Sequence, residues 1–325
     1  MILSRDIGID LGTATTMICD RKGRIIVREP SVVAVDVKTK RVVATGTQAK
    51  QMIGRTPGSI VAVRPLKNGV IADFDMTADM LHSFIFRSDK RSMFSKTRVV
   101  ISVPSGVTEV ERRAVEDAVR SAGAQDVELI DEPMAAALGA GLPVYEPTGS
   151  MIVDIGGGTT DVAVLSLGGI AACKSIKVGG EAMDEAIIDF IKREFNILIG
   201  DRTAEEVKLD LGSALPLRDE RRARIRGRDM VTNLPQTTEI TSTQIYEALH
   251  EPCMAILGAI KWVLERTPPE LAADVMRGGI HLTGGGSQLF GLDQYIATEL
   301  GIPVLLAKEP TDCATLGLGY LVENL

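Results

Sequence analysis

The 325-residue chain has few aromatic side chains: they make up 4% of it and include a single Trp. Its core must therefore depend on aliphatic residues. The four cysteines are widely scattered and form no CxxC pair, which indicates neither a zinc site nor a disulfide framework and favours buried thiols in a reducing cytoplasm. The sequence shows neither the apolar core of a signal peptide nor a run long enough to span a membrane. The formal net charge of −7 argues against broad nucleic-acid binding.

Two segments far apart in the chain follow one pattern. Residues 7–16 read IGIDLGTATT and residues 152–161 read IVDIGGGTTD, so each is an apolar strand with one Asp, followed by a turn of Gly and Thr. Strand and helix patterns alternate in both halves, and the stretch 142–149, which contains Pro and Gly, is the best boundary between them. The sequence therefore predicts two similar α/β lobes.

The first of these turns has the composition of a phosphate-binding loop. Gly12 permits close approach of the backbone to an anion. Backbone N–H groups and hydroxyls of Gly12, Thr13, Ala14 and Thr15 could then hold phosphate oxygens. Asp10 would hold a hydrated Mg²⁺, which prefers oxygen ligands. A hairpin turn with an Asp for turn chemistry explains the same residues equally well.

The second turn repeats this composition with three glycines, Gly156, Gly157 and Gly158, before Thr159, and Asp154 precedes it. Three glycines are costly in chain entropy, which favours a contact between backbone and ligand. A bulge or a flexible turn is the alternative. Two such turns, one in each half, indicate a nucleotide cleft between the lobes more strongly than either turn alone.

A third turn, formed by Gly284, Gly285, Gly286, Ser287 and Gln288, joins a predicted strand to a predicted helix. Its backbone could accept a nucleotide, and a plain connection is the alternative. None of the three turns matches a P-loop or the Rossmann G-x-G-x-x-G fingerprint. Those two classes of nucleotide site are therefore not indicated.

Six motifs occur in order along the chain: IGIDLGTATT, DEPMAAALGAG, VDIGGGTTDVAV, VGGEAMDEAI, AEEVKLDLGSA and HLTGGGSQLFGL. This set resembles the actin, hexokinase and heat-shock chaperone ATPase superfamily. Within it, REPSVVAVD, GRTPGSIVAVRPLKNGVIADFD and IRGRDMVTNLP resemble the MreB/Mbl family of bacterial actin-like cell-shape proteins, and the resemblance spans nearly the whole chain. It implies an α/β, actin-like ATPase fold of two similar lobes with a nucleotide cleft between them. Lobe I is expected at residues 1–145 plus 313–325, with a small subdomain at about 33–75, and lobe II at 146–312, with a small subdomain at about 180–250.

The resemblance also implies ATP and Mg²⁺ between the lobes, with the first turn holding the phosphates from one side and the second from the other. Asp10 and Asp154 would contact the magnesium through waters. Glu132 matches the position that orients the attacking water, Thr159 would help to position that water, and Asp154 completes the catalytic set. The reaction would be phosphoryl transfer to water. Without the resemblance, Glu132 is explained as an acid at a helix N-terminus.

Glu205, Glu206 and Lys208 match the nucleoside-binding helix of the family. The glutamates would hydrogen-bond the sugar hydroxyls, Lys208 would lie near the base, and the third turn would close over the adenine. A solvated charged helix face is the alternative, above all for Glu206. Two positions depart from the family pattern: Thr15 stands where Asn is usual, and Asp161 stands where Glu is common. These departures bear on the turnover rate more than on nucleotide binding.

Two further segments suggest surfaces for partners. Between residues 87 and 98 the sequence RSDKRSMFSKTR places Met93 and Phe94 among cations, a composition suited to an anionic membrane. Packing of both side chains into the protein's own core is the alternative, and the resemblance favours the membrane. The strongly basic segment 217–228 is either a solvated loop or helix face or a contact with a filament or another partner.

The function implied by the resemblance is that of a self-assembling cytoskeletal ATPase with slow turnover. It would form paired antiparallel filaments from head-to-tail contacts, lie peripherally on the cytoplasmic face of the cell membrane, and guide cell-wall synthesis to maintain rod shape. RodZ-like and MreC-like membrane proteins are the implied partners, and nucleic acid is not one. A soluble sugar-kinase-like phosphotransferase of the same superfold is the alternative, but no additional substrate domain is evident. A chaperone ATPase would need a peptide-binding domain after the ATPase pattern.

Overall fold

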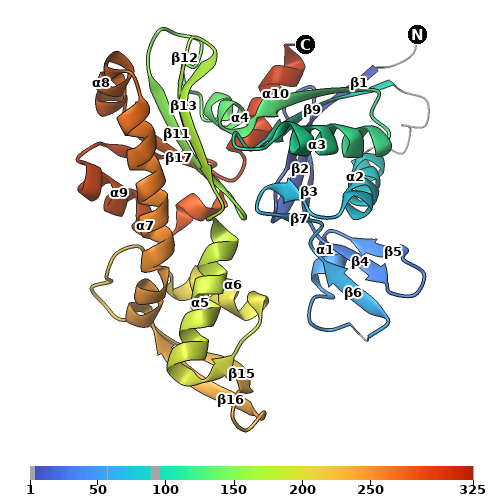
Figure 1. Ribbon diagram of the computed structural model, residues 1–325, viewed down its shortest axis with the longest axis vertical. Helices are drawn as coiled ribbons and strands as arrows, with labels where there is room; N and C mark the ends of the chain where they lie inside the picture. The colour runs from blue at the N-terminus through green and yellow to red at the C-terminus, as the bar shows by residue number, and fades with distance from the viewer. Residues whose placement is uncertain (1–3, 57, 89–95, 325) are drawn as a thin grey trace.

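The computed structural model describes residues 4–56, 58–88 and 96–324, which form two lobes side by side (Figure 1). The first lobe is built on a five-stranded sheet in the order β10-β9-β1-β2-β3. β9 lies parallel to both β1 and β10, whereas β2 lies antiparallel to both β1 and β3. The strands are β1 (Ser4–Leu11), β2 (Thr15–Asp20), β3 (Ile25–Pro30), β9 (Lys96–Val103) and β10 (Asp126–Asp131).

The second lobe repeats this topology strand for strand. Its sheet has the order β13-β12-β11-β17-β18, with β17 parallel to both β11 and β18 and with β12 antiparallel to both β11 and β13. β1 thus corresponds to β11 and β2 to β12, which confirms that the repeated sequence pattern marks two similar α/β lobes. The strands are β11 (Ser150–Ile155), β12 (Thr160–Ser166), β13 (Gly169–Ile176), β17 (Ile280–Thr283) and β18 (Val304–Leu306).

Residues on the two faces of each central strand pack against different helices. Ile7 and Ile9 of β1 belong to a core shared with α2 and α3, and Met151 and Val153 of β11 belong to a core shared with α5 and α7. The intervening residue Gly8 faces α10 instead. Because side chains alternate along a strand, every second residue of β1 and β11 is turned towards the junction of the lobes. These helices are α2 (Phe74–Ser88), α3 (Glu109–Ser121), α5 (Gly180–Phe195), α7 (Ser242–Arg266) and α10 (Cys313–Glu323).

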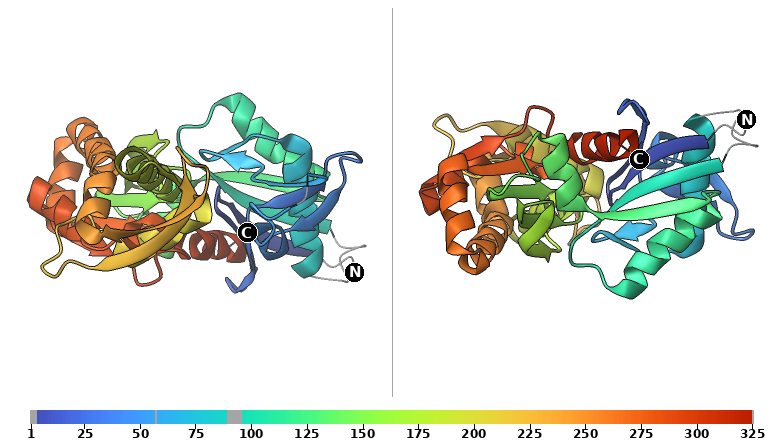
Figure 2. Two further views of the ribbon diagram at one scale, coloured as in Figure 1. Left: turned by 90° about the horizontal axis from the view of Figure 1, so that it is seen from below. Right: turned by 90° about the horizontal axis from the view of Figure 1, so that it is seen from above.

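The junction is formed by α10 and by α4 (Glu132–Gly139), and Figure 2 shows the red helix α10 between the lobes. Gly139 of α4 faces Gly317 of α10 at the crossing of the two helices. A Cβ atom on Gly139 would overlap the backbone of Cys313, and one on Gly317 would overlap the backbone of Ala135. The two helices therefore meet backbone to backbone, which only glycine allows.

Each lobe carries a smaller sheet at the end away from α4 and α10 (Figure 1). In the first lobe, helix α1 packs beside a sheet with the strand order β5-β4-β6. In the second lobe, helix α6 packs beside a sheet with the strand order β14-β15-β16. The elements are β4 (Val33–Asp36), β5 (Val42–Thr45), α1 (Thr47–Lys50), β6 (Ile60–Val63), β14 (Ile197–Leu198), α6 (Asp201–Leu211), β15 (Arg222–Asp229) and β16 (Pro235–Thr241). The two-stranded sheet of β7 (Leu66–Lys67) and β8 (Val70–Ile71) precedes α2.

The structure corrects one expectation. Most of the basic segment is the strand β15 rather than a loop or helix face, because Ala223 and Ile225 alternate with exposed arginines and turn inwards. Helix α7 runs unbroken from Ser242 to Arg266 with Pro252 buried inside it, although proline usually kinks or ends a helix. The remaining helices are α8 (Pro269–Gly278) and α9 (Leu292–Leu300). Within the described ranges, no helix is both long enough and apolar enough to cross a membrane.

Candidate nucleotide-binding cleft

A cleft of about 550 Å³ lies between the lobes and is lined by residues of both. All three glycine-rich turns contribute to it, as do the helices α4, α5 and α6. The residues that the sequence predicted and that line this cleft are Asp10, Gly12, Thr13, Ala14, Thr15, Glu132, Asp154, Gly156, Gly157, Glu205, Lys208, Gly284, Gly285, Gly286 and Gln288.

The first two turns are hairpin connections that face each other across the cleft. A Cβ atom at Gly157 would lie 2.6 Å from Cβ of Ala14, and one at Gly158 would lie 2.5 Å from Oγ1 of Thr13. No real Cβ atom sits so close to a neighbour. The glycines of the second turn are therefore required for the approach of the lobes as well as for any contact with a ligand.

The third turn lies against the second at the end of β11. Gly284 has a φ of 80°, and its amide donates a 2.7 Å hydrogen bond to the carbonyl of Pro310. A Cβ atom there would overlap the Asp154 carboxyl and the Ile155 carbonyl, so both the backbone angle and the available space favour glycine. The 3₁₀ helix η2 (Gly285–Gln288) follows directly and lies between β17 and α9.

Asp10 and Asp154 occupy equivalent positions, each as the next-to-last residue of its central strand. Both are buried, at 8% and 6% exposure. Burial raises the pKa of Asp10 to about 6, against hydrogen bonds that lower it, among them one at 3.4 Å from Thr315. Burial, together with the charges of Asp10 and Asp161, raises the pKa of Asp154 to about 8. The two lobes thus bring a pair of carboxyl groups to one site that favours a proton or a cation.

Glu132 adds a third acid at the first turn of α4. The residue before it ends β10, and Pro133 fixes the start of the helix. Burial raises its pKa well above the usual range, and the charges of Asp161, Asp154 and Asp10 raise it further. The raised pKa makes the ionised carboxylate of Glu132 a stronger base, and a cation bound among these acids would favour that ionised form.

Asp161 connects the second hairpin to the first lobe. Its Oδ1 accepts a 3.0 Å hydrogen bond from the backbone amide of Ser105, and its Oδ2 accepts one of 3.2 Å from the hydroxyl of Ser175. The side chain is 1% exposed, and burial raises its pKa to about 6. Glutamate is common at this position in the family that the sequence resembles. Here the shorter Asp161 accepts the hydrogen bond from Ser105 and so joins the two lobes.

Four predicted residues are not brought to the lining of the cleft. Gly158 and Thr159 lie beside it, with Thr159 packed near Gly69. The hydroxyl of Ser287 is turned back to the carbonyl of Gly284. Glu206 lies on the outer face of α6, where its side chain is 61% exposed and pairs with Arg202 at 2.9 Å. Met93 and Phe94 lie outside the described residues.

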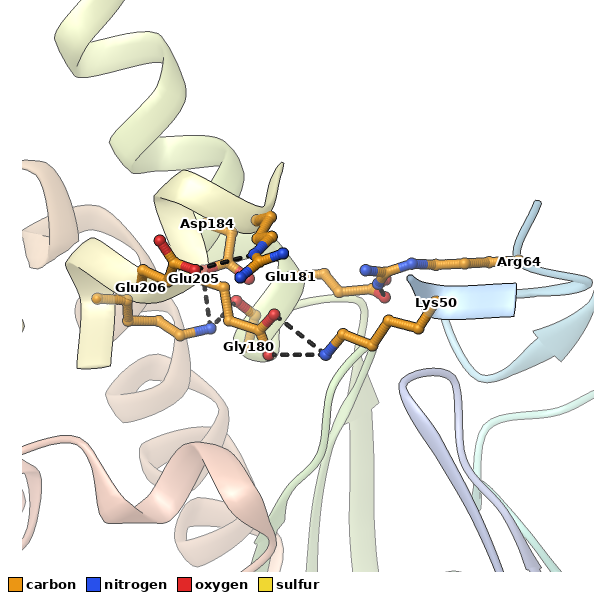
Figure 3. A network of polar contacts seen from close by, with 9 residues as sticks. Lys50, Arg64, Gly180, Glu181, Asp184, Glu205 and Glu206 are labelled. Carbon is orange, nitrogen blue, oxygen red and sulfur yellow. Dashed lines mark hydrogen bonds and ion pairs between the residues drawn. The ribbon is translucent and has the colours of Figure 1, made fainter. Parts of the chain in front are cut away.

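The charged residues that line the cleft but were not predicted from the sequence include Lys50, Arg64, Glu181 and Asp184. Figure 3 shows them in one polar network with Glu205 and the α5 N-terminus at Gly180. Lys208 belongs to the same network, because its Nζ donates a 2.7 Å hydrogen bond to the Gly180 carbonyl and lies 2.9 Å from Asp184. It thereby joins α6 to α5. Charge alone could not have indicated these contacts, since such residues usually lie on solvated surfaces.

The repeated sheets, the paired hairpin turns and the buried acids between two lobes define an actin-like, two-lobed nucleotide-binding protein. A crystal structure of MreB 5 of Spiroplasma citri bound to AMPPNP is similar to this chain, with a TM-score of 0.92 and 39% identity over 98% of this chain and 96% of that one. A second structure of the same protein, bound to ADP, has a TM-score of 0.93.

Residues 4–325 match the MreB/Mbl protein family, to which this chain belongs. Its relatives include the cell shape-determining protein Mbl of Bacillus subtilis, 48% identical over 324 residues that cover all of this chain and 97% of Mbl. The cell shape-determining protein MreB of Escherichia coli is also 48% identical, over all of this chain and 95% of that protein. These similarities do not favour the sugar-kinase-like alternative.

Proposed function

We propose that this chain is an ATP-dependent cytoskeletal protein that assembles into filaments and thereby helps to determine cell shape. The observation that carries the proposal is the cleft itself: two equivalent hairpin turns and two equivalent buried aspartates from the two lobes converge on one site. Full-length similarity to cell shape-determining proteins supports the cellular role.

The site fits ATP with a magnesium ion. Gly12 and Gly156 line the cleft from opposite lobes, and free backbone N–H groups of their two turns would bind the phosphate anion there. The charge of Asp10 helps to raise the pKa of Asp154, so positive charge is favoured beside this pair of carboxyl groups. The pair is thus suited to a divalent cation. No three or more His, Cys, Asp or Glu side chains in the described part of the chain are arranged to hold a metal ion by themselves. This agrees with an ion held largely by phosphates and waters, where it would neutralise charge on the transferred phosphoryl group.

Glu132 is the proposed base for hydrolysis. It lines the cleft close enough to Asp154 and Asp161 for their charges to raise its pKa. A carboxylate so placed can orient a water molecule and take its proton. Thr159, next to the cleft, would help to orient that water, and the α6 residues Glu205 and Lys208 would contact the nucleoside.

Assembly would use head-to-tail contacts, which produce open filaments when the rotation between subunits does not close a ring. Paired antiparallel filaments at the inner face of the membrane, with RodZ-like and MreC-like partners, are the arrangement we propose. A single copy of the segment with Met93 and Phe94 would bind lipid weakly, so binding would depend on the many copies in a filament.

Electron microscopy of the purified chain with Mg-ATP, with and without anionic liposomes, tests this proposal. We expect filaments that coat or deform the liposomes. Monodisperse protein across nucleotides, lipids and salt concentrations would contradict the cytoskeletal function.

A further inference from the structure

Two ion pairs cross the cleft and connect the small sheet region of the first lobe to helices α5 and α6 of the second. We propose that these pairs, Lys50–Glu205 and Arg64–Glu181, act as a clasp that holds the lobes together over a bound nucleotide and sets the rate at which it leaves. All four residues line the cleft, and Figure 3 shows the pairs reaching across it from opposite sides. The inference rests on the proposed binding of nucleotide in this cleft.

The first pair joins the end of α1 to the middle of α6. The Nζ of Lys50 lies 3.2 Å from Oε2 and 3.4 Å from Oε1 of Glu205, so both oxygens share one ammonium group. The side chains are 45% and 40% exposed, so the interaction is weakened by water and by salt. A carboxylate has about four acceptor positions, which leaves Glu205 able to accept from a ribose hydroxyl while it is paired. Lys50 would thereby position the carboxylate predicted to bind the sugar.

The second pair is better shielded and is connected to the predicted phosphate-binding turn. Arg64 follows β6, and its guanidinium contacts Glu181 in the first turn of α5, with the two side chains 31% and 24% exposed. The backbone amide of Glu181 donates a 2.8 Å hydrogen bond to the carbonyl of Gly157, in the second glycine-rich turn. Arg64 therefore holds the helix end that is itself bonded to the predicted phosphate-binding turn.

The two carboxylates of the clasp belong to one rigid unit. Lys208 of α6 bonds to the Gly180 carbonyl and pairs with Asp184 of α5, which fixes the two helices to each other. Opening the cleft at Glu205 would accordingly also move Glu181 away from the first lobe. The two pairs must then break together, which makes their effects on nucleotide release add up although each pair is weak.

A matched control lies on the same helix. Arg202 and Glu206 of α6 pair at 2.9 Å, with side chains 68% and 61% exposed, but both residues belong to one helix and the pair does not cross the cleft. If ion pairs affected release only through general surface charge, Arg202→Met would act like Arg64→Met, because both changes remove one positive charge. If the clasp acts by joining the lobes, Arg202→Met leaves the release rate unchanged.

The test uses the full chain loaded with a fluorescent ATP analogue and Mg²⁺, and follows release in stopped flow after unlabelled ATP is added. We expect Lys50→Met and Arg64→Met each to speed release by up to about fivefold, as expected for pairs of this exposure. Arg64→Met/Glu181→Gln should match the single variants rather than multiply their effects, because either change removes the same pair. Lys50→Arg, which keeps the positive charge, should release nucleotide as slowly as the wild-type chain. Added salt should speed release more in the wild-type chain than in Lys50→Met, because only the wild-type chain has this ion pair to screen.

Unchanged release in Lys50→Met and Arg64→Met, in chains that melt at the wild-type temperature, would overturn the clasp and leave nucleotide binding intact. Faster release in Arg202→Met to the same extent would overturn it as well. If the wild-type chain itself retained no nucleotide, the proposed function would fail together with the clasp.

Discussion

The backbone amide of Ser105 donates a 3.0 Å hydrogen bond to Oδ1 of Asp161, across the junction between the first lobe and the second hairpin. Because Asp161 is buried, its removal leaves that amide without a partner. We expect Asp161→Ala to lower the free energy of unfolding by about 1–3 kcal/mol, measured by urea denaturation. Asp161→Asn, which keeps an acceptor oxygen, should lose clearly less. Equal losses in the two variants would assign the effect to something other than this hydrogen bond.

The pKa of Asp154 predicts a pH dependence of stability. Its folded-state value of about 8 lies above the ordinary 3.8, so between these values the folded chain holds a proton that the unfolded chain has lost. The stability that this group contributes is present in full below about pH 4 and is lost as pH rises through about 8. Without nucleotide or divalent ions, Asp154→Asn should therefore gain stability relative to wild type between pH 6 and pH 8, by on the order of 1–2 kcal/mol.

Urea unfolding at the two pH values, in the presence of a chelator, measures this difference. Asp117→Asn, on the exposed face of α3, serves as the control and should show no such gain. A constant offset between wild type and Asp154→Asn across this range would refute the assignment.

Gly158 is predicted to be intolerant of any side chain. Its Cβ atom would lie 2.5 Å from Oγ1 and 2.9 Å from Cβ of Thr13, so the two hairpin turns would have to move apart. We expect Gly158→Ala to weaken ATP binding by about tenfold or more, measured by titration with a fluorescent analogue. Gly258→Ala is the matched control, because nothing lies within 4 Å of a Cβ atom at that glycine. Comparable losses in both variants would show that the contact between the turns is unimportant.

Glu132→Gln separates hydrolysis from binding. The amide cannot take a proton from water, so steady-state phosphate release should fall by about 10²–10⁴-fold while nucleotide affinity is kept. Glu128→Gln, on the exposed side of β10, should hydrolyse ATP at the wild-type rate. Retained turnover in Glu132→Gln would remove Glu132 from the mechanism.

The membrane prediction concerns Met93 and Phe94, whose sequence context is apolar residues among cations. Replacing both by Ser should abolish sedimentation with anionic liposomes and leave ATP binding intact, because the inserted apolar area is lost. Met230→Ser/Val231→Ser is the control, since these residues are 45% and 79% exposed in the turn between β15 and β16. Liposome binding that survives the first change, or is lost equally in the second, would count against a role of Met93 and Phe94 in membrane binding.

The sequence was sufficient where the signal is local. The strand, Asp and glycine turn at residues 7–16 recur at 152–161, and the two segments form equivalent hairpins because each carries its own strand pattern and its own turn. It was insufficient where a role depends on segments meeting in three dimensions. Lys50 and Glu205 are 155 positions apart, and neither residue's neighbours in the chain indicate that they pair. In β15 the alternation of Arg with Ala223 and Ile225 is a strand pattern, but the high charge of the segment is equally typical of a solvated loop or helix face.

Where α4 crosses α10, no side chain separates the two backbones at Gly139 and Gly317, although Ala135 and Leu318 pack beside this point. Side chains that interdigitate resist rotation, because turning one element requires many of them to change rotamer together. Gly139 and Gly317 have no rotamers to change, so we expect a small rotation of α4 against α10 to cost little at these two positions. The clasp residues belong to α1, to the end of β6 and to helices α5 and α6, which Figure 1 shows away from α4 and α10. A small rotation at the two glycines therefore produces a larger displacement at the clasp. In this way a small bound nucleotide can control the opening between two whole lobes.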